Sequence, residues 1–285
     1  MRMKSFCKLA LASSILFAGI AQAAAGCLDD IRTAGKLRVG VGVMGLKPWI
    51  WQQEDGAYTG LENEILEFVA KDMGLEYEYV ITEWTTLIPG LKAERWDIVM
   101  SGMGKTEQRV AEGKISFSDF YFMYHDRIVV KKDSPIQNIE DLKGKTLAST
   151  MGSNDSLVAH SLVEKGVADK VMDYNNFGEP FVALRNGQVD AVVMDQAVLV
   201  AQMSEMDDLR IVGEPLYFVP SAEWAEVQNK ADYRLGSTGV ALRPECDDLR
   251  IAFNSGLKKL DEQGERQKIL SKYGLWDESQ TNFAK

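Results

Sequence analysis

The sequence predicts an α/β protein of two lobes, each a mostly parallel sheet flanked by helices. Three observations support this prediction. A β-α-β-α-β order of elements occurs twice along the chain, a polar segment at 131–145 separates the two series, and 285 residues are enough for two modest domains. The polar segment favours two lobes over one domain with a single long sheet. A cleft between such lobes is the expected ligand site.

The first series of elements follows from hydrophobic periodicity. Alternating or apolar runs such as KLRVGVGV and LEYEYVI are typical of strands, whereas apolar residues at helical spacing, closed by Gly74, indicate a helix. Strands are predicted at 36–43, 75–81 and 96–101, and helices at 60–73 and 85–93.

The second series starts near residue 131 and repeats the same pattern. Strands are predicted at 145–149, 170–174 and 191–194, and helices at 156–165, 179–186 and, in the tail, within 247–273. We therefore expect lobe 1 to contain 28–130 and 236–285, and lobe 2 to contain 131–235.

The first 23 residues form a predicted signal peptide. A basic start with Arg2, Lys4 and Lys8 precedes an apolar run at 9–20, and AQA at 21–23 fits a signal peptidase site. The run is shorter than the ~20 residues that span a bilayer. Its removal would change the formal net charge from −10 to −13, because it carries three basic and no acidic residues. We expect an exported protein that binds no nucleic acid, since no basic block offsets this charge.

Two cysteines remain after this cleavage, Cys27 and Cys246. Thiols in an oxidising compartment usually pair, which favours a disulfide between them. The alternative is a lipid anchor on Cys27, because AAGC at 24–27 is similar to a lipoprotein cleavage motif. Ala24 stands where that motif prefers Leu, so we favour the disulfide.

The stretch VMSGMGKTEQRV at 99–110 contains the ending of a phosphate-binding loop. Such a loop needs a Gly five residues before Gly104, and Val99 stands there. A second near match at 144–146 has Ile139 where the Gly should be. The sequence therefore predicts no nucleotide-binding loop and no cofactor.

Catalytic and metal-binding motifs are missing from the sequence as well. There are two histidines, His125 in an aromatic stretch and His160 in a predicted helix, and H-E-x-x-H, C-x-x-C and G-x-S-x-G do not occur. Acidic pairs at 207–208 and 247–248 are typical of turns and helix caps. We expect no catalytic residue and no metal site.

Seven short motifs run in order through nearly all of the chain after residue 23. They are KPW at 47–49 with GAYTGLENEI at 56–65, EWTTLIPGL at 83–91 with WDI at 96–98, GM at 102–103 with TEQR at 106–109, ISFS at 115–118 with Tyr121, DLKGK at 141–145, GQVDA at 187–191 and the tail at 264–274. Together they resemble the periplasmic amino-acid-binding proteins of ABC transporters, solute-binding protein family 3. The resemblance implies the type II two-lobed periplasmic-binding-protein fold with a two-stranded hinge.

The resemblance also implies a ligand site between the lobes. Arg109 matches the arginine that clamps the ligand's α-carboxylate. The Gly102 carbonyl matches an acceptor for the α-ammonium, and Asp195 matches an acidic residue of the other lobe that pairs with it. Trp84 and Trp49 match aromatic positions that cover the ligand's side chain. The remaining matched positions lie near turns and at the start of a helix in lobe 2: Gly104, Thr106, Thr150, Gly152, Ser153 and Asn154.

Each assignment has a structural alternative. Arg109 could brace its own helix, Asp195 could be a helix N-cap after its strand, and Trp84 and Trp49 could be core aromatics. The motif around Arg109 favours the ligand role. The other tryptophans are assigned to packing or to the surface: Trp51, Trp96, Trp224 and Trp276.

The sequence departs from the family at four places. Gly104 stands where a Ser or Thr hydroxyl is usual, Leu46 replaces a frequent aromatic residue, and Val43 replaces an early acidic residue. A segment near 217–234 is extra, in a size range where long loops tend to be functional. These departures leave the ligand's identity open.

The resemblance implies a monomeric solute receptor that closes on an amino acid or a related zwitterionic or carboxylate solute, and that docks on an ABC transporter permease. The alternative is an enzyme on the same scaffold, similar to the cyclohexadienyl dehydratases. Such an enzyme needs a general acid in the cleft, and Glu83, Lys47 and Lys105 are the nearest candidates.

Overall fold

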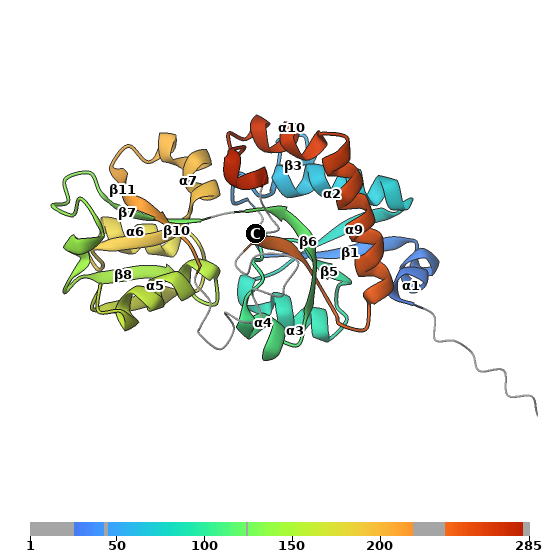
Figure 1. Ribbon diagram of the computed structural model, residues 1–285, viewed down its shortest axis with the longest axis horizontal. Coiled ribbons are helices and arrows are strands. Elements are labelled where there is room, and N and C mark those ends of the chain that lie inside the picture. The colour runs from blue at the N-terminus through green and yellow to red at the C-terminus, as the bar shows by residue number, and fades with distance from the viewer. Residues whose placement is uncertain (1–25, 43–44, 124, 219–236, 282–285) are drawn as a thin grey trace, which may run out of the picture.

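The computed structural model describes residues 26–42, 45–123, 125–218 and 237–281. They form two lobes side by side, each built on one five-stranded sheet (Figure 1). The predicted signal peptide, Val43, Trp224 and most of the segment at 217–234 lie outside the described residues.

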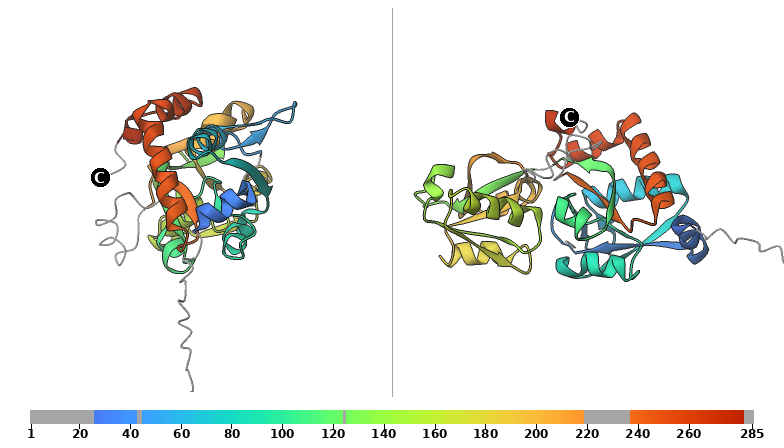
Figure 2. Two further views of the ribbon diagram at one scale, coloured as in Figure 1. Left: turned by 90° about the vertical axis from the view of Figure 1, so that its right-hand side faces the viewer. Right: turned by 60° about the horizontal axis from the view of Figure 1, so that its bottom comes forward.

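Lobe 1 has the sheet order β4-β1-β5-β12-β6. Its strands are β1 (Lys36–Val41), β4 (Glu76–Ile81), β5 (Ile98–Val99), β6 (Ser116–Phe122) and β12 (Thr238–Leu242). Its helices are α1 (Cys27–Ala34), α2 (Leu61–Met73), α3 (Leu87–Lys92), α4 (Glu107–Ala111), α9 (Asp247–Glu262) and α10 (Glu265–Lys272). A small hairpin pairs β2 (Trp51–Gln52) with β3 (Tyr58–Thr59). The C-terminal helices lie on this lobe beside α2 (Figure 2).

Lobe 2 has the sheet order β11-β7-β10-β8-β9. Its strands are β7 (Asp126–Lys131), β8 (Thr146–Thr150), β9 (Lys170–Tyr174), β10 (Ala191–Asp195) and β11 (Leu209–Leu216). Its helices are α5 (Asn154–Glu164), α6 (Glu179–Arg185) and α7 (Gln196–Gln202).

Both sheets are mixed, which differs from the mostly parallel sheets predicted from the sequence. In lobe 1, β1 pairs parallel with β4 and β5, whereas β12 is antiparallel to β5 and β6. In lobe 2, β8 pairs parallel with β9 and β10, whereas β7 is antiparallel to β10 and β11. The antiparallel strands flank the two crossings between the lobes. The chain leaves the first sheet after β6 and has joined the second sheet by β7, so the first crossing precedes Asp126 and does not lie at 130–131 as the sequence suggested.

The lobe 1 core explains two features of its sequence. On α2, Leu61, Ile65 and Leu66 are fully buried and face the sheet, as their helical spacing predicts. Trp96 is also buried and packs against Gly90, where an added Cβ would lie 2.0 Å from the Trp96 ring. Only glycine fits at that position of α3.

The C-terminal segment fastens the first crossing between the lobes. Gln280, which is buried, accepts a hydrogen bond from the Met123 backbone N–H at 3.0 Å and donates one to the Met123 carbonyl at 2.6 Å. Arg266 in turn donates to the Gln280 carbonyl at 3.0 Å. These bonds hold the hinge strand against lobe 1.

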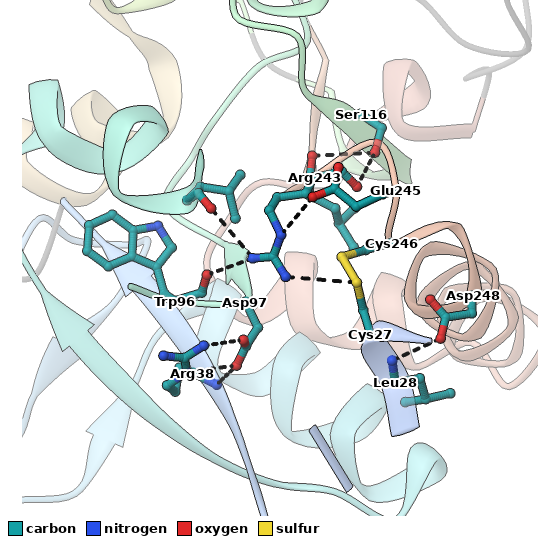
Figure 3. The surroundings of a disulfide bond; sticks show 12 residues. Cys27, Leu28, Arg38, Trp96, Asp97, Ser116, Arg243, Glu245, Cys246 and Asp248 are labelled. Atoms are coloured by element: carbon teal, nitrogen blue, oxygen red, sulfur yellow. Dashed lines mark hydrogen bonds and ion pairs between the residues drawn. A yellow bond between two sulfur atoms is a disulfide. The ribbon is translucent and has the colours of Figure 1, made fainter. Parts of the chain in front are cut away.

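The predicted disulfide is present and joins α1 to the start of α9 (Figure 3). The Cα atoms of Cys27 and Cys246 lie 5.2 Å apart, and Cys246 is fully buried. Asp248 accepts a hydrogen bond from the Leu28 N–H at 2.9 Å beside the bridge. Since the Cys27 sulfur is bonded to Cys246, it is not the free thiol that the lipid-anchor alternative requires.

Candidate ligand-binding site

A cavity lies between the lobes, at the carboxyl ends of strands from both sheets. Lobe 1 and lobe 2 each contribute five of the residues that line it: Leu46, Trp49, Trp84, Ser101, Gly102, Ser153, Asn154, Asp155, Phe177 and Asp195. Its volume of about 20 Å³ is enough for one water molecule. A solute the size of an amino acid would fit only if the lobes moved apart.

The Gly102 turn after β5 is fixed by a buried carboxyl group. Glu62 on α2 accepts hydrogen bonds from the Gly102 N–H at 2.6 Å and from the Tyr121 hydroxyl. Gly102 has a φ of +64°, in the left-handed region that favours glycine. Burial raises the pKa of Glu62 to about 7, although both hydrogen bonds favour the ionised form. The sequence motif contained Glu62, but it gave no sign of this supporting role.

Arg109 lies at the boundary between the lobes and is 7% exposed. The Thr106 hydroxyl caps α4 by accepting a hydrogen bond from the Arg109 N–H at 3.3 Å. The guanidinium donates to the carbonyl of Gly104 in lobe 1 and, at 2.8 Å, to the carbonyl of Gly152 in lobe 2. It also lies 5.5 Å from the centroid of the Trp84 ring, a cation–π distance. Arg109 therefore reaches groups of both lobes.

A second, larger cavity adjoins the first across Trp84. It has a volume of about 280 Å³, and its lining is mostly apolar with one cation, Arg109. The lining residues are Trp84, Thr85, Ile88, Pro89, Met103, Arg109, Met151 and Gly152. Trp84 lines both cavities, whereas Asp195 lines only the smaller one and Arg109 only the larger one. Separation of the lobes would join the two cavities into one cleft.

Asp195 ends β10 and lines the first cavity. Its carboxyl group caps α7 by accepting a hydrogen bond from the Val198 N–H at 2.9 Å, and it accepts another from the side chain of Trp49 in lobe 1. It therefore is the N-cap that the structural alternative described, and it also faces the cleft. Burial, with the neighbouring charge of Asp155, raises the pKa of Asp195 to about 7.

Two further carboxyl groups that the sequence reading missed lie beside Asp195. Asp155 is the second residue of α5 and lines the cavity, and Asp126 stands directly opposite Asp195 in the β7–β10 register. The side chains of Asp126 and Asp155 hydrogen-bond to each other. Burial raises the pKa of Asp155 to about 6, and burial together with the charge of Asp155 raises that of Asp126 well above its ordinary value. Asp155 directly follows the predicted site residues Ser153 and Asn154, and this adjacency is the sequence signal that could have placed Asp155 in the site.

The other predicted residues divide into lining and supporting positions. Trp49, Trp84, Gly102, Ser153, Asn154 and Asp195 line the first cavity, whereas Arg109 and Gly152 line the second. The structure does not bring Gly104, Thr106 and Thr150 into either lining. Gly104 and Thr106 position Arg109, and the Thr150 hydroxyl donates to the Asn176 carbonyl at 3.4 Å. Ser153 also caps α5 by accepting from the Ser156 N–H at 3.1 Å.

Metal and membrane features were sought over the same residues. Within the described ranges, no group of three His, Cys, Asp or Glu side chains is arranged to hold a metal ion. The helices described in the structure include none that is long and apolar enough to cross a bilayer. In lobe 2, Asp126 and Asp155 form a hydrogen-bonded pair, and Asp195 lies beside them and interacts with Asp155 through its charge.

Comparison with known proteins identifies the class to which this fold and cleft belong. The sequence pattern of the bacterial extracellular solute-binding proteins, family 3, matches residues 37–275. The chain therefore belongs to this family.

Three known proteins illustrate the similarity. The arginine-binding extracellular protein ArtP of Bacillus subtilis is 28% identical over 272 residues, covering 95% of this chain and 98% of that protein. The structure of holo ArgBP from T. maritima is 30% identical with a TM-score of 0.68, covering 86% of this chain and 99% of that one. The ancestral amino acid-binding protein AncCDT-1, a precursor of cyclohexadienyl dehydratase, is 30% identical with a TM-score of 0.69, covering 86% of this chain and 98% of that one. The type II two-lobed fold is confirmed.

Proposed function

We propose that this protein is an extracytoplasmic receptor that captures an α-amino acid between its lobes. One observation carries the proposal: a guanidinium from lobe 1, Arg109, and a carboxyl group from lobe 2, Asp195, both border the interlobe cleft beside Trp84. A zwitterion has the opposite pair of charges. An arginine fork binds a carboxylate with two hydrogen bonds, and a buried carboxylate needs a cationic partner such as an ammonium group.

Several contacts join the two lobes across the cleft, and a bound ligand would replace them. Arg109 donates to the Gly152 carbonyl, Trp49 donates to Asp195, and the rings of Trp84 and Phe177 meet edge to face at 5.4 Å. A ligand carboxylate would take the Arg109 donors, and a ligand ammonium would join Asp195. The closed form is then stabilised by contacts that only the loaded protein makes. The moving units in this proposal are the described residues 26–42, 45–123 and 237–281 on one side, and 125–218 on the other.

The relatives support this function. Two of the proteins compared above carry names that state arginine or amino acid binding, and the family is described as extracellular. We propose that this chain likewise works outside the cytoplasm after removal of residues 1–23, as a monomer, and delivers its ligand to the permease of an ABC transporter.

Binding, and not catalysis, is the function we propose for the cleft. The three candidate acids named from the sequence do not line either interlobe cavity: Glu83 is exposed, Lys47 borders a surface depression near Trp51, and Lys105 lies on the turn before α4. Incubation with prephenate or arogenate tests the dehydratase alternative. We expect no product, and formation of phenylpyruvate or phenylalanine would establish it.

A thermal-shift screen tests the proposed function. A ligand present at 100 times its dissociation constant stabilises the native state by about 2.7 kcal/mol, which raises the melting temperature measurably. We expect at least one α-amino acid to do so and to change tryptophan fluorescence, because Trp49 and Trp84 border the cleft. If every amino acid, opine, betaine and organic acid leaves the melting temperature unchanged, the proposal is wrong.

A further inference from the structure

We propose that the cleft contains a second cation-binding subsite, formed by Asp155 and Asn154 with Asp126 behind them. Its occupant is the distal ammonium or guanidinium group of an amino acid whose α-ammonium pairs with Asp195. The preferred ligand then has a net positive charge. This inference rests on the proposed function and specifies its substrate class.

The first argument is a buried acceptor atom that lacks a donor beside a carboxyl pair. Asp155, Asn154 and Asp126 are neighbours here: the carboxyl groups of Asp155 and Asp126 hydrogen-bond to each other, whereas the Oδ1 atom of Asn154 has no hydrogen-bond partner among the described residues. The three side chains are 2%, 4% and 1% exposed, and the first two line the cavity. A buried acceptor without a donor is destabilising, so native proteins pair such atoms. A ligand with several N–H groups supplies the donors.

The second argument is the balance of charge in the cleft. Three carboxyl groups, Asp126, Asp155 and Asp195, lie together in lobe 2, and the positive charge of Arg109 acts on Asp155. A neutral zwitterion matches Arg109 with its carboxylate and Asp195 with its ammonium. The hydrogen-bonded pair of Asp126 and Asp155 holds one proton and retains one negative charge. A second positive group on the ligand neutralises that charge.

The third argument concerns the kind of cation. Trp49, Trp84 and Phe177 line the cavity, and aromatic faces also attract quaternary ammonium groups. A quaternary ammonium has no N–H, however, and leaves the Asn154 amide oxygen without a donor. The acceptors therefore favour a primary ammonium or a guanidinium over a methylated amine.

The charged groups around Asp155 add a measurable consequence. Asp155 is faced by Asp126 from β7, Asp195 from β10 and Arg109 from α4. Asp173 on β9 instead hydrogen-bonds to Ser156 and His160. Burial raises the pKa of Asp155 to about 6 and that of Asp195 to about 7. A cationic group bound beside them stabilises their ionised forms, so binding near pH 6.5 releases protons.

The experiment compares each basic amino acid with a neutral or methylated counterpart. The dissociation constants of L-arginine and L-citrulline, and of L-lysine, L-norleucine and Nε-trimethyl-L-lysine, are measured by isothermal titration calorimetry with the wild-type protein in two buffers of different ionisation enthalpy. We expect one basic member to bind about 100-fold more tightly than its neutral counterpart, the size expected when a buried charge loses its partner, and to release protons. Trimethyl-lysine should bind more weakly than lysine.

Matched variants locate the effect. Asp155→Asn should reduce the basic-to-neutral ratio to about tenfold or less, whereas Asp169→Asn, at an exposed position of lobe 2, should leave it unchanged. Equal affinity of wild-type protein for citrulline and arginine, and for norleucine and lysine, would overturn the inference without touching the proposed function. A ratio that survives in a folded Asp155→Asn variant would also overturn it, as would tight binding of trimethyl-lysine. If no α-amino acid binds at all, the proposed function fails first and the inference fails with it.

Discussion

Replacement of Arg109 by Ala tests the clamp on the ligand's α-carboxylate. In the proposed complex, both donors of the guanidinium fork bind this carboxylate in a buried site, since Arg109 is only 7% exposed. Removing one partner of a buried charge pair costs about 3–5 kcal/mol. We therefore expect ligand affinity to fall about 10² to 4 × 10³-fold, at tenfold per 1.4 kcal/mol. Arg109→Lys keeps the positive charge but loses the guanidinium fork, so its ligand affinity should lie between those of the wild-type protein and the Ala variant.

The assay measures affinity by isothermal titration calorimetry, with the free energy of unfolding as a check on the fold. The check is needed because Arg109→Ala also removes donors from the Gly104 and Gly152 carbonyls, each worth about 1–3 kcal/mol when buried. Arg250→Ala is the control, because Arg250 on α9 lines neither interlobe cavity and pairs with Asp247. Full affinity in a folded Arg109→Ala variant would refute the carboxylate clamp.

Two further predictions concern stability. The pKa of Glu62 rises from its ordinary value of 4.5 to about 7 in the folded state. Between pH 4.5 and about pH 7, Glu62 therefore binds more protons in the folded than in the unfolded state. The unfolding free energy should fall on the order of 3 kcal/mol as pH rises through this window. Urea unfolding at pH 5 and 7.5 checks this, and a Glu62→Gln variant with an unchanged pH dependence would contradict it. The Cys27–Cys246 bond closes a loop of 219 residues, so the double Ser variant should lose about 2–5 kcal/mol of unfolding free energy. A double Ser variant as stable as the wild-type protein would show that the disulfide does not stabilise the fold.

Regular elements with strong local signals could be predicted from the sequence. The strand at 170–174 coincides with β9, and the helix at 60–73 differs from α2 by one residue, because apolar spacing and a closing glycine define it. Helix α5 begins two residues before its predicted start, since the Ser153 cap is set by its hydrogen bond to the Ser156 N–H.

The strands near the hinge could not be predicted in the same way. Strands β6, β7, β11 and β12 owe their positions to antiparallel pairing between segments distant in sequence, such as β12 with β6. No local turn signal connects these segments, so periodicity gave neither their partners nor their direction. The misplaced crossing at 130–131 has the same origin.

The candidate site shows the same limit. Motifs indicated Arg109, Asp195 and the two tryptophans, which border the cleft. The carboxyl pair of Asp126 and Asp155 escaped notice because their 29-residue separation becomes a contact only when β7 and α5 meet β10. Thr106 and Thr150 matched the family pattern, yet burial directs their hydroxyls to backbone groups.

The most direct test of amino acid binding changes the ligand and leaves the protein unaltered. Wild-type protein is titrated calorimetrically with the amino acid that stabilises it most and with the amine that lacks only its α-carboxylate, for example L-arginine and agmatine. We predict one ligand per chain and a loss of affinity of about 10² to 4 × 10³-fold for the amine, because Arg109 then has no carboxylate to bind. An amine that binds as tightly as the amino acid would contradict the account.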